Sequence, residues 1–194
     1  SGIDLDNRQI STFVDLSAIA PGVNVAKNEG FKTVITIRGV GYETNQNAIA
    51  TPSVSYHLDG IYVASPYSLQ TDFLDLERIE VLRGPQGTLF GQNSTGGAIN
   101  VVTQAPTTDE TYGSADLTVG NHGLLKTRAF INKPISENLA MRASFISNKR
   151  DGFTENLTNG QDLDDADSVS ARVRVSYEPS DIFRANFMAQ MFHE

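Results

Sequence analysis

The residue types that most often support catalysis or metal binding are scarce and scattered in this chain. Its three histidines, His57, His122 and His193, are far apart and have no clustered partner ligands, so they do not indicate a metal site. The chain has no Cys, which excludes thiolate catalysis, Cys-ligated zinc and a disulfide framework. A sugar hydrolase would need two facing carboxylates at a defined separation, and the sequence does not demonstrate such a pair. We therefore predict no catalytic and no metal-binding residue.

Two glycine-rich segments and one acidic run could be mistaken for ligand-binding motifs. Residues 39–42 (GVGY) lack the third glycine of a dinucleotide fingerprint, and residues 84–91 lack the Lys-Ser/Thr pair of a phosphate loop. We expect the glycines of the second segment to allow tight turns and close packing. Residues 162–167 contain four carboxylates that could bind calcium, but their order is not that of an EF-hand loop. A solvated loop is the favoured interpretation.

Composition narrows the class of partner. The 194 residues include 15 Lys and Arg and 23 Asp and Glu, which gives a net charge of −8. Since no basic stripe is present, we expect no nucleic-acid partner. No run approaches the ~18 apolar residues of a membrane-spanning helix, and residues 1–4 do not resemble the start of a signal peptide. Alternating strands of a membrane β-barrel remain possible, because they never form a long apolar run.

The first half of the chain indicates a compact mixed α/β domain. Residues 12–15 match a capping box, and the apolar face that follows ends at Pro21-Gly22. Residues 33–38, 77–83 and 98–103 are predicted strands. The segment between the last two, residues 84–97, is too rich in glycine for a regular element.

Asp59-Gly60 predicts a two-residue hairpin turn, in which both central residues need positive φ. This turn would pair Leu58 with Ile61 and Tyr56 with Val63 on one face. His57 and Tyr62 would share the other face.

The second half changes to strict alternation of apolar and polar residues over segments of about ten residues. We count five such strands, joined by short turns at one end and by a longer polar loop, residues 151–167, at the other. This pattern fits an outer-membrane barrel, and a soluble antiparallel sheet with one solvated face is the alternative. We place the boundary near residues 106–110, which gives domains of residues 1–107 and 108–194.

One ordered set of motifs resembles a known family. Residues 74–91 (LDLERIEVLRGPQGTLFG) and 96–103 (GGAINVVT) closely resemble the plug domain of TonB-dependent outer-membrane receptors. Residues 37–39 (IRG), residues 58–60 (LDG) and the opening at residues 10–23 fall where that family has similar elements. The resemblance covers roughly residues 3–107, and the alternating strands that follow look like the start of the family's barrel.

The resemblance implies the fold class, the activity and the location. An α+β plug domain would be followed by the first antiparallel strands of a large transmembrane β-barrel, incomplete in this chain because the family's barrel has about 22 strands. The receptor would lie in the bacterial outer membrane, in contact with its lipid, and take up a scarce extracellular small molecule. In this family the molecule is most often a ferric siderophore, and cobalamin, haem and oligosaccharides are the alternatives. TonB would drive rearrangement of the plug through a box that we expect upstream of residue 1. The ligand would be an iron chelate, and no resident cofactor is implied.

The resemblance also implies roles for particular residues. Arg38 and Arg83 each end a strand and precede glycine, and they match plug arginines that bind barrel carboxylates, here expected beyond residue 194. Arginine suits such a bidentate, partly buried contact better than lysine does. Substrate contacts would come from three plug loops, residues 26–30, 40–50 and 64–71. These loops offer amides and phenols that can donate to chelate oxygens, namely Asn28, Tyr42, Asn45, Gln46, Asn47, Tyr67 and Gln70.

The predicted polar face of the strands has a strong excess of positive charge. Six cations and one acid lie on it, namely Lys126, Arg128, Arg142, Arg172, Arg174, Arg184 and Asp116. Such a face could attract anionic chelates. We favour contact with the acidic plug, because a wall beside a plug must satisfy its buried charges.

A rival hypothesis is a soluble periplasmic binding or assembly protein built on a plug-like domain. It would end near residue 194, whereas a receptor would continue with further alternating segments. Five strands cannot close a barrel, because the smallest barrels have about eight. We therefore expect this chain to be the N-proximal piece of a longer receptor.

Overall fold

The chain forms two compact units, Ser1–Gln104 and Ala105–Glu194. The computed structural model describes residues 2–8, 10–28, 32–41, 52–64, 72–158, 160 and 162–193. The predicted division after residue 107 lies three residues beyond the end of the first unit. Within the described ranges, every helix is too short or too polar to cross a membrane.

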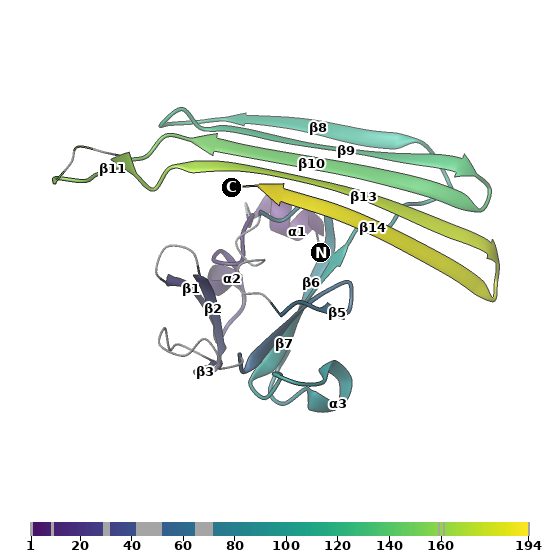
Figure 1. Ribbon diagram of the computed structural model, residues 1–194, viewed down its shortest axis with the longest axis horizontal. Coiled ribbons are helices and arrows are strands. Elements are labelled where there is room, and N and C mark those ends of the chain that lie inside the picture. Colours follow the sequence, from purple (N-terminus) through teal and green to yellow (C-terminus); the bar gives the residue numbers. More distant parts are fainter. Residues whose placement is uncertain are drawn as a thin grey trace. The chain divides into compact units, whose positions relative to one another are not determined.

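The described residues of the first unit form two small sheets and three short helices (Figure 1). An antiparallel sheet has the order β1-β2-β3, and a mixed sheet has the order β5-β4-β7-β6. In chain order the elements are α1 (Gly2–Asn7), α2 (Leu16–Ile19), β1 (Val23–Asn28), β2 (Lys32–Ile37), β3 (Val40–Gly41), β4 (Val54–Leu58), β5 (Ile61–Tyr62), β6 (Leu76–Arg83), α3 (Gly87–Phe90) and β7 (Gly97–Thr103).

The predicted hairpin turn is confirmed. Asp59 and Gly60 have φ of 50° and 79°, as a turn that matches the twist of the strands requires. Leu58 pairs with Ile61, and the Val63 amide donates to the Tyr56 carbonyl at 2.9 Å. The hairpin therefore has the register that the sequence predicts.

The longer-range pairing was not predicted. Strand β4 pairs in parallel with β7, and β7 pairs antiparallel with β6. A side chain could not be accommodated at Gly97, because an added Cβ would lie 2.4 Å from the Leu82 carbonyl oxygen and 2.8 Å from Ile37 Cδ1. The end of β2 therefore packs closely against the start of β7.

Several helices and strands of the first unit differ from the sequence prediction. Half of the capping box forms, since the Asp15 carboxylate accepts from the Thr12 amide at 2.8 Å, but residues 13–15 form a turn and α2 begins only at Leu16. Residues 84–97 were predicted to lack regular structure, which is wrong in part, because Gly87–Phe90 form the one-turn helix α3. Helix α1 was not predicted, and neither were β1 and β3.

The core of the first unit lies between these elements. Phe13 is 2% exposed and meets the rings of Tyr56 and Phe73 edge-on, at centroid distances of 5.1 and 4.9 Å. Such aromatic pairs add ~1 kcal/mol beyond the area that they bury. Leu16 and Ile37 are also almost fully buried, so the turn before α2 and the end of β2 share one core.

The second unit is an antiparallel sheet of the five predicted strands, in the order β14-β13-β10-β9-β8 (Figure 1). Its elements are β8 (Tyr112–Val119), β9 (Leu125–Ser136), β10 (Leu139–Arg150), β11 (Thr154–Glu155), β12 (Asp162–Leu163), β13 (Ala166–Ser180) and β14 (Phe183–His193). The predicted polar loop contains the small hairpin of β11 and β12, which was not predicted.

The register separates two chemically different faces. One face presents exposed apolar side chains, namely Leu117, Val119, Leu125, Ile131, Phe145, Val173, Tyr177, Phe187 and Met191. The opposite face has Asp116 beside Arg128, Arg142 beside Arg174, and Arg172 beside Gln190. The predicted partition of apolar and polar residues is therefore confirmed.

Candidate functional site

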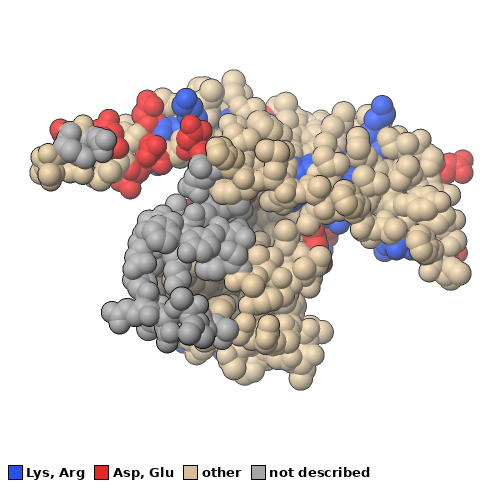
Figure 2. Space-filling model, viewed as in Figure 1, with Lys and Arg blue, Asp and Glu red and all other residues tan. Residues whose placement is uncertain are grey.

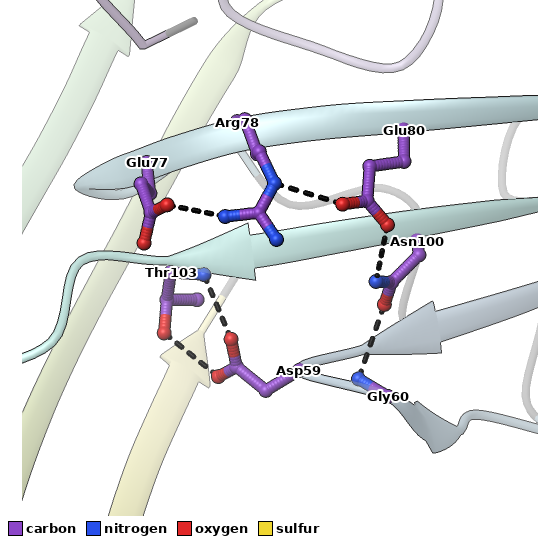
Figure 3. A network of polar contacts seen from close by, with 7 residues as sticks. All are labelled: Asp59, Gly60, Glu77, Arg78, Glu80, Asn100 and Thr103. Atoms are coloured by element: carbon purple, nitrogen blue, oxygen red, sulfur yellow. Dashed lines mark hydrogen bonds and ion pairs between the residues drawn. The ribbon is translucent and has the colours of Figure 1, made fainter.

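A polar network ties the Asp59-Gly60 turn to the rest of its sheet (Figure 3). The Asp59 carboxylate accepts from the Thr103 amide at 2.8 Å and from the Thr103 hydroxyl at 2.7 Å. The Asp59 amide in turn donates to the Val101 carbonyl at 2.8 Å. The turn is thus attached to the end of β7, the last strand of the unit.

The second arm of the network crosses the sheet to β6. Asn100 accepts from the Gly60 amide at 3.1 Å and donates to the Glu80 carboxylate at 2.9 Å. The other oxygen of Glu80 accepts from Arg78 Nε at 2.8 Å, and Arg78 also pairs with Glu77. Hydrogen bonds from Asn100 and Arg78 hold the pKa of the Glu80 carboxyl below its usual range. The turn that follows β4 is therefore linked through side chains to β7 and β6, and the three strands also pair through their backbones.

Sequence reasoning found the turn and missed the network. Asp59 was identified only as a residue that tolerates positive φ, and Asn100 only as part of a strand. Asn100 interrupts an apolar strand, Gly97–Thr103, in which the other residues are small, apolar or β-branched. A polar amide at such a position is a signal that could have indicated a buried hydrogen-bond partner.

The predicted face shared by His57 and Tyr62 is covered by the glycine-rich segment. His57 is 3% exposed, and its ring meets Phe90 at 4.8 Å and Tyr62 at 5.6 Å. Asn93 donates to the Tyr62 hydroxyl at 2.8 Å. Burial lowers the pKa of the His57 imidazole. His57 is thus a packed side chain beneath α3, as expected.

Arg38 and Arg83, the two predicted locking residues, both lie exposed at strand ends in the first unit. Arg38 follows β2 with φ of 53°, and its amide donates to the Gly22 carbonyl at 2.6 Å. Arg83 pairs with Gly97, which is the residue that Ile37 approaches. The structure therefore brings together the strand ends that carry the two arginines.

The side chains predicted to contact the substrate lie outside the described part of the chain. Asn28 is the last residue of β1, but its side chain is not among those described. The other six, Tyr42, Asn45, Gln46, Asn47, Tyr67 and Gln70, lie outside the described residues. All seven stay predictions.

Two cations of the second unit, Arg172 and Arg184, bind side chains of their own sheet. Arg172, 5% exposed, donates through Nε to Gln190 at 2.9 Å. Arg184 pairs with Glu178 at 2.7 Å. Glu178 is thus a second acid near this face, beside the predicted Asp116. The face is therefore less cationic than its predicted composition suggests.

Acidic side chains gather around the β10–β13 connection (Figure 2). The carboxylates of this connection are exposed, and Asp164 accepts from the Thr154 hydroxyl at 2.5 Å. Across the described part of the chain, no group of three or more His, Cys, Asp or Glu residues is arranged to hold a metal ion.

Comparison with known proteins identifies the family. Residues 1–98 match the family model described as the TonB-dependent receptor plug domain. The chain belongs to this family. Membership agrees with the predicted motifs, which fall in the plug domain between α1 and β7.

Curated relatives of this plug domain are receptors. The pesticin receptor of Yersinia pestis is 29% identical over 187 residues, which cover 93% of this chain and 27% of the relative. The ferric enterobactin receptor PirA of Pseudomonas aeruginosa is 30% identical over 178 residues, which cover 81% and 24%. The chain therefore spans about a quarter of the length of these relatives.

A solved structure shares both units. The ferric yersiniabactin uptake receptor FyuA from Yersinia pestis aligns with a TM-score of 0.86 and 26% identity, over 99% of this chain and 30% of that one. The predicted fold class is confirmed, namely a plug domain followed by antiparallel strands of a barrel that does not close within these residues. The family also assigns the chain to the outer membrane of a Gram-negative bacterium.

The Asp59 contacts generate a stability prediction. Asp59→Ala leaves the buried Thr103 hydroxyl and amide without this acceptor, so we expect the plug to lose about 1–3 kcal/mol of unfolding free energy. Urea titration of the full-length receptor, followed by hydrogen exchange of the β6 and β7 amides, measures the change. The control is Glu77→Ala, which removes an exposed ion pair worth below about 1 kcal/mol. Equal effects of the two substitutions would contradict the importance of the Asp59 contacts.

Burial of His57 should make the stability of the plug depend on pH. Its pKa is lowered in the folded state, so the unfolded state binds a proton more readily. The plug should therefore lose stability as the pH falls through the ordinary His value of about 6.5. His57→Gln should flatten this dependence in urea titrations between about pH 7.5 and 5.5, while substitution of the exposed His122 by Gln should leave it unchanged. The interpretation fails if the wild-type plug is equally stable across that range.

Proposed function

We propose that the whole protein is an energy-coupled outer-membrane receptor that takes up a ferric siderophore. It would bind its ligand with plug loops and barrel, and release it through a TonB-driven rearrangement of the plug. The mechanism would involve binding and conformational change without bond-breaking chemistry. The ligand would be an iron chelate, and no resident cofactor would be needed.

The proposal rests on a plug domain that is followed by long strands with two chemically different faces. A sheet with one apolar exposed face and one charged face is suited to separate lipid from a polar interior. The names of the relatives support an iron chelate, because PirA is a receptor for ferric enterobactin and FyuA takes up ferric yersiniabactin. The soluble alternative gains no support, since so large an exposed apolar face would favour aggregation in water.

The two exposed arginines support a lock between plug and barrel. Both side chains are exposed in the first unit, so they are open to carboxylates from other parts of the whole protein. Carboxylates from strands beyond residue 194 would supply bidentate partners. The other partners would be TonB, bound through a segment upstream of residue 1, and the lipid that contacts the apolar face.

Uptake of an iron chelate tests the proposed activity. A strain that lacks the gene should lose uptake of radioactive iron given as ferric yersiniabactin or ferric enterobactin, and the full-length gene should restore it. Restoration should depend on TonB, which a tonB deletion checks. If the deletion strain takes up both chelates as the parent strain does, the iron assignment should be dropped.

The arginine lock generates a separate prediction. Arg83→Ala in the full-length receptor should loosen the plug and increase ion conductance through reconstituted receptors. Arg83→Lys should restore little of the lock, because lysine cannot make the bidentate contact. Substitution of the exposed Arg184 by Ala is the control, since its partner Glu178 lies within the second unit. Unchanged conductance and transport in the Arg83→Ala receptor would count against the lock.

A further inference from the structure

A buried asparagine on β9 holds the segment that precedes the first strand of the sheet. Asn132 is 0% exposed. Its Oδ1 accepts from the Thr107 amide at 2.9 Å. Its Nδ2 lies 3.0 Å from the Thr107 carbonyl, 3.3 Å from the Thr107 hydroxyl and 2.9 Å from the Glu110 carbonyl. One side chain thus binds three backbone groups of the linker, residues 105–111.

An arginine on β10 holds the point where the linker becomes a strand. Arg142 is 4% exposed and donates to the Tyr112 hydroxyl at 3.0 Å. Its guanidinium lies 4.1 Å from the centroid of the Phe130 ring and 5.5 Å from that of Tyr112. Asn132 pairs with both Tyr112 and Arg142 in the sheet register, so the two contacts are adjacent.

We propose that Asn132 and Arg142 form a mechanical anchor for the linker. This anchor would transmit force from the plug to β9 and β10 and would keep the linker fixed while the plug is rearranged. The proposal rests on the proposed function for the source of the force, because TonB would pull on the plug. The anchor itself consists of contacts within the second unit alone.

The position of the contacts explains why such an anchor would be needed. Strand β8 has eight residues, and its backbone pairing with β9 begins at Tyr112 opposite Asn132. Force applied to residue 111 would load these pairs one at a time, starting from that end. The side-chain hydrogen bonds of Asn132 hold residues 107 and 110, which precede the first backbone pair at Tyr112. These hydrogen bonds must break before the pulling force reaches β8. Arg142 then connects the first residue of β8 to β10, which is not its backbone neighbour.

Mechanical extension of the full-length receptor tests the anchor without ligand or TonB. When the receptor is pulled by the N-terminus of this chain in a lipid bilayer, extension of the wild type should halt where residue 107 is held. About 350–385 Å of chain then separates that point from residue 1. In Asn132→Ala the halt should move to Tyr112, which adds about 16–18 Å for five residues. Asn132→Leu, which retains side-chain volume, should give the same shift.

A matched substitution controls for general effects on the polar face. Asn186 is an exposed amide on β14, at the opposite edge of the sheet from β8, and Asn186→Ala should leave the halt at residue 107. A halt at the same length in wild type and in both Asn132 variants would overturn the anchor. This outcome is independent of uptake, so it can be distinguished from failure of the proposed function.

Discussion

Parallel pairing of β4 with β7 is the constraint on which the first unit depends. The two strands are separated by the hairpin return, β6 and the glycine-rich segment, so their pairing fixes a long stretch of chain at once. Asp59 and Asn100 reinforce it with side chains at the turn. Because the turn needs positive φ and Gly97 must admit the Leu82 carbonyl, small changes at these few positions would affect the whole sheet.

The second unit obeys a different constraint. Its strands alternate strictly, so one register assigns every apolar residue to one face and nearly every charge to the other. Buried charges on the polar face are matched by local partners, such as Gln190 for Arg172. This pairing lowers the cost of placing charge where water is scarce. The same alternation leaves an exposed apolar face, which suits contact with lipid and agrees with membership in an outer-membrane family.

The proposed transport cycle places different demands on the two units. A plug that rearranges must have contacts that can be broken, and exposed arginines such as Arg83 at its strand ends would provide them. The wall must stay intact while force passes through the linker. Asn132 would satisfy this demand, because its amide binds backbone groups of Thr107 and Glu110 in the linker and is shielded from competing water.

The sequence alone determined the family, the five strands, the two faces and the Asp59-Gly60 hairpin, because local turn chemistry and period-two alternation are readable residue by residue. It did not determine that β4 pairs with β7, since pairing partners depend on contacts between residues distant in the chain. It also placed residues 84–97 outside regular structure, whereas packing of Phe90 on His57 accompanies a helical turn there. Asn132 appeared as an ordinary polar-face residue. Only the tertiary structure assigned it to the linker, because its partners Thr107 and Glu110 lie more than twenty residues away.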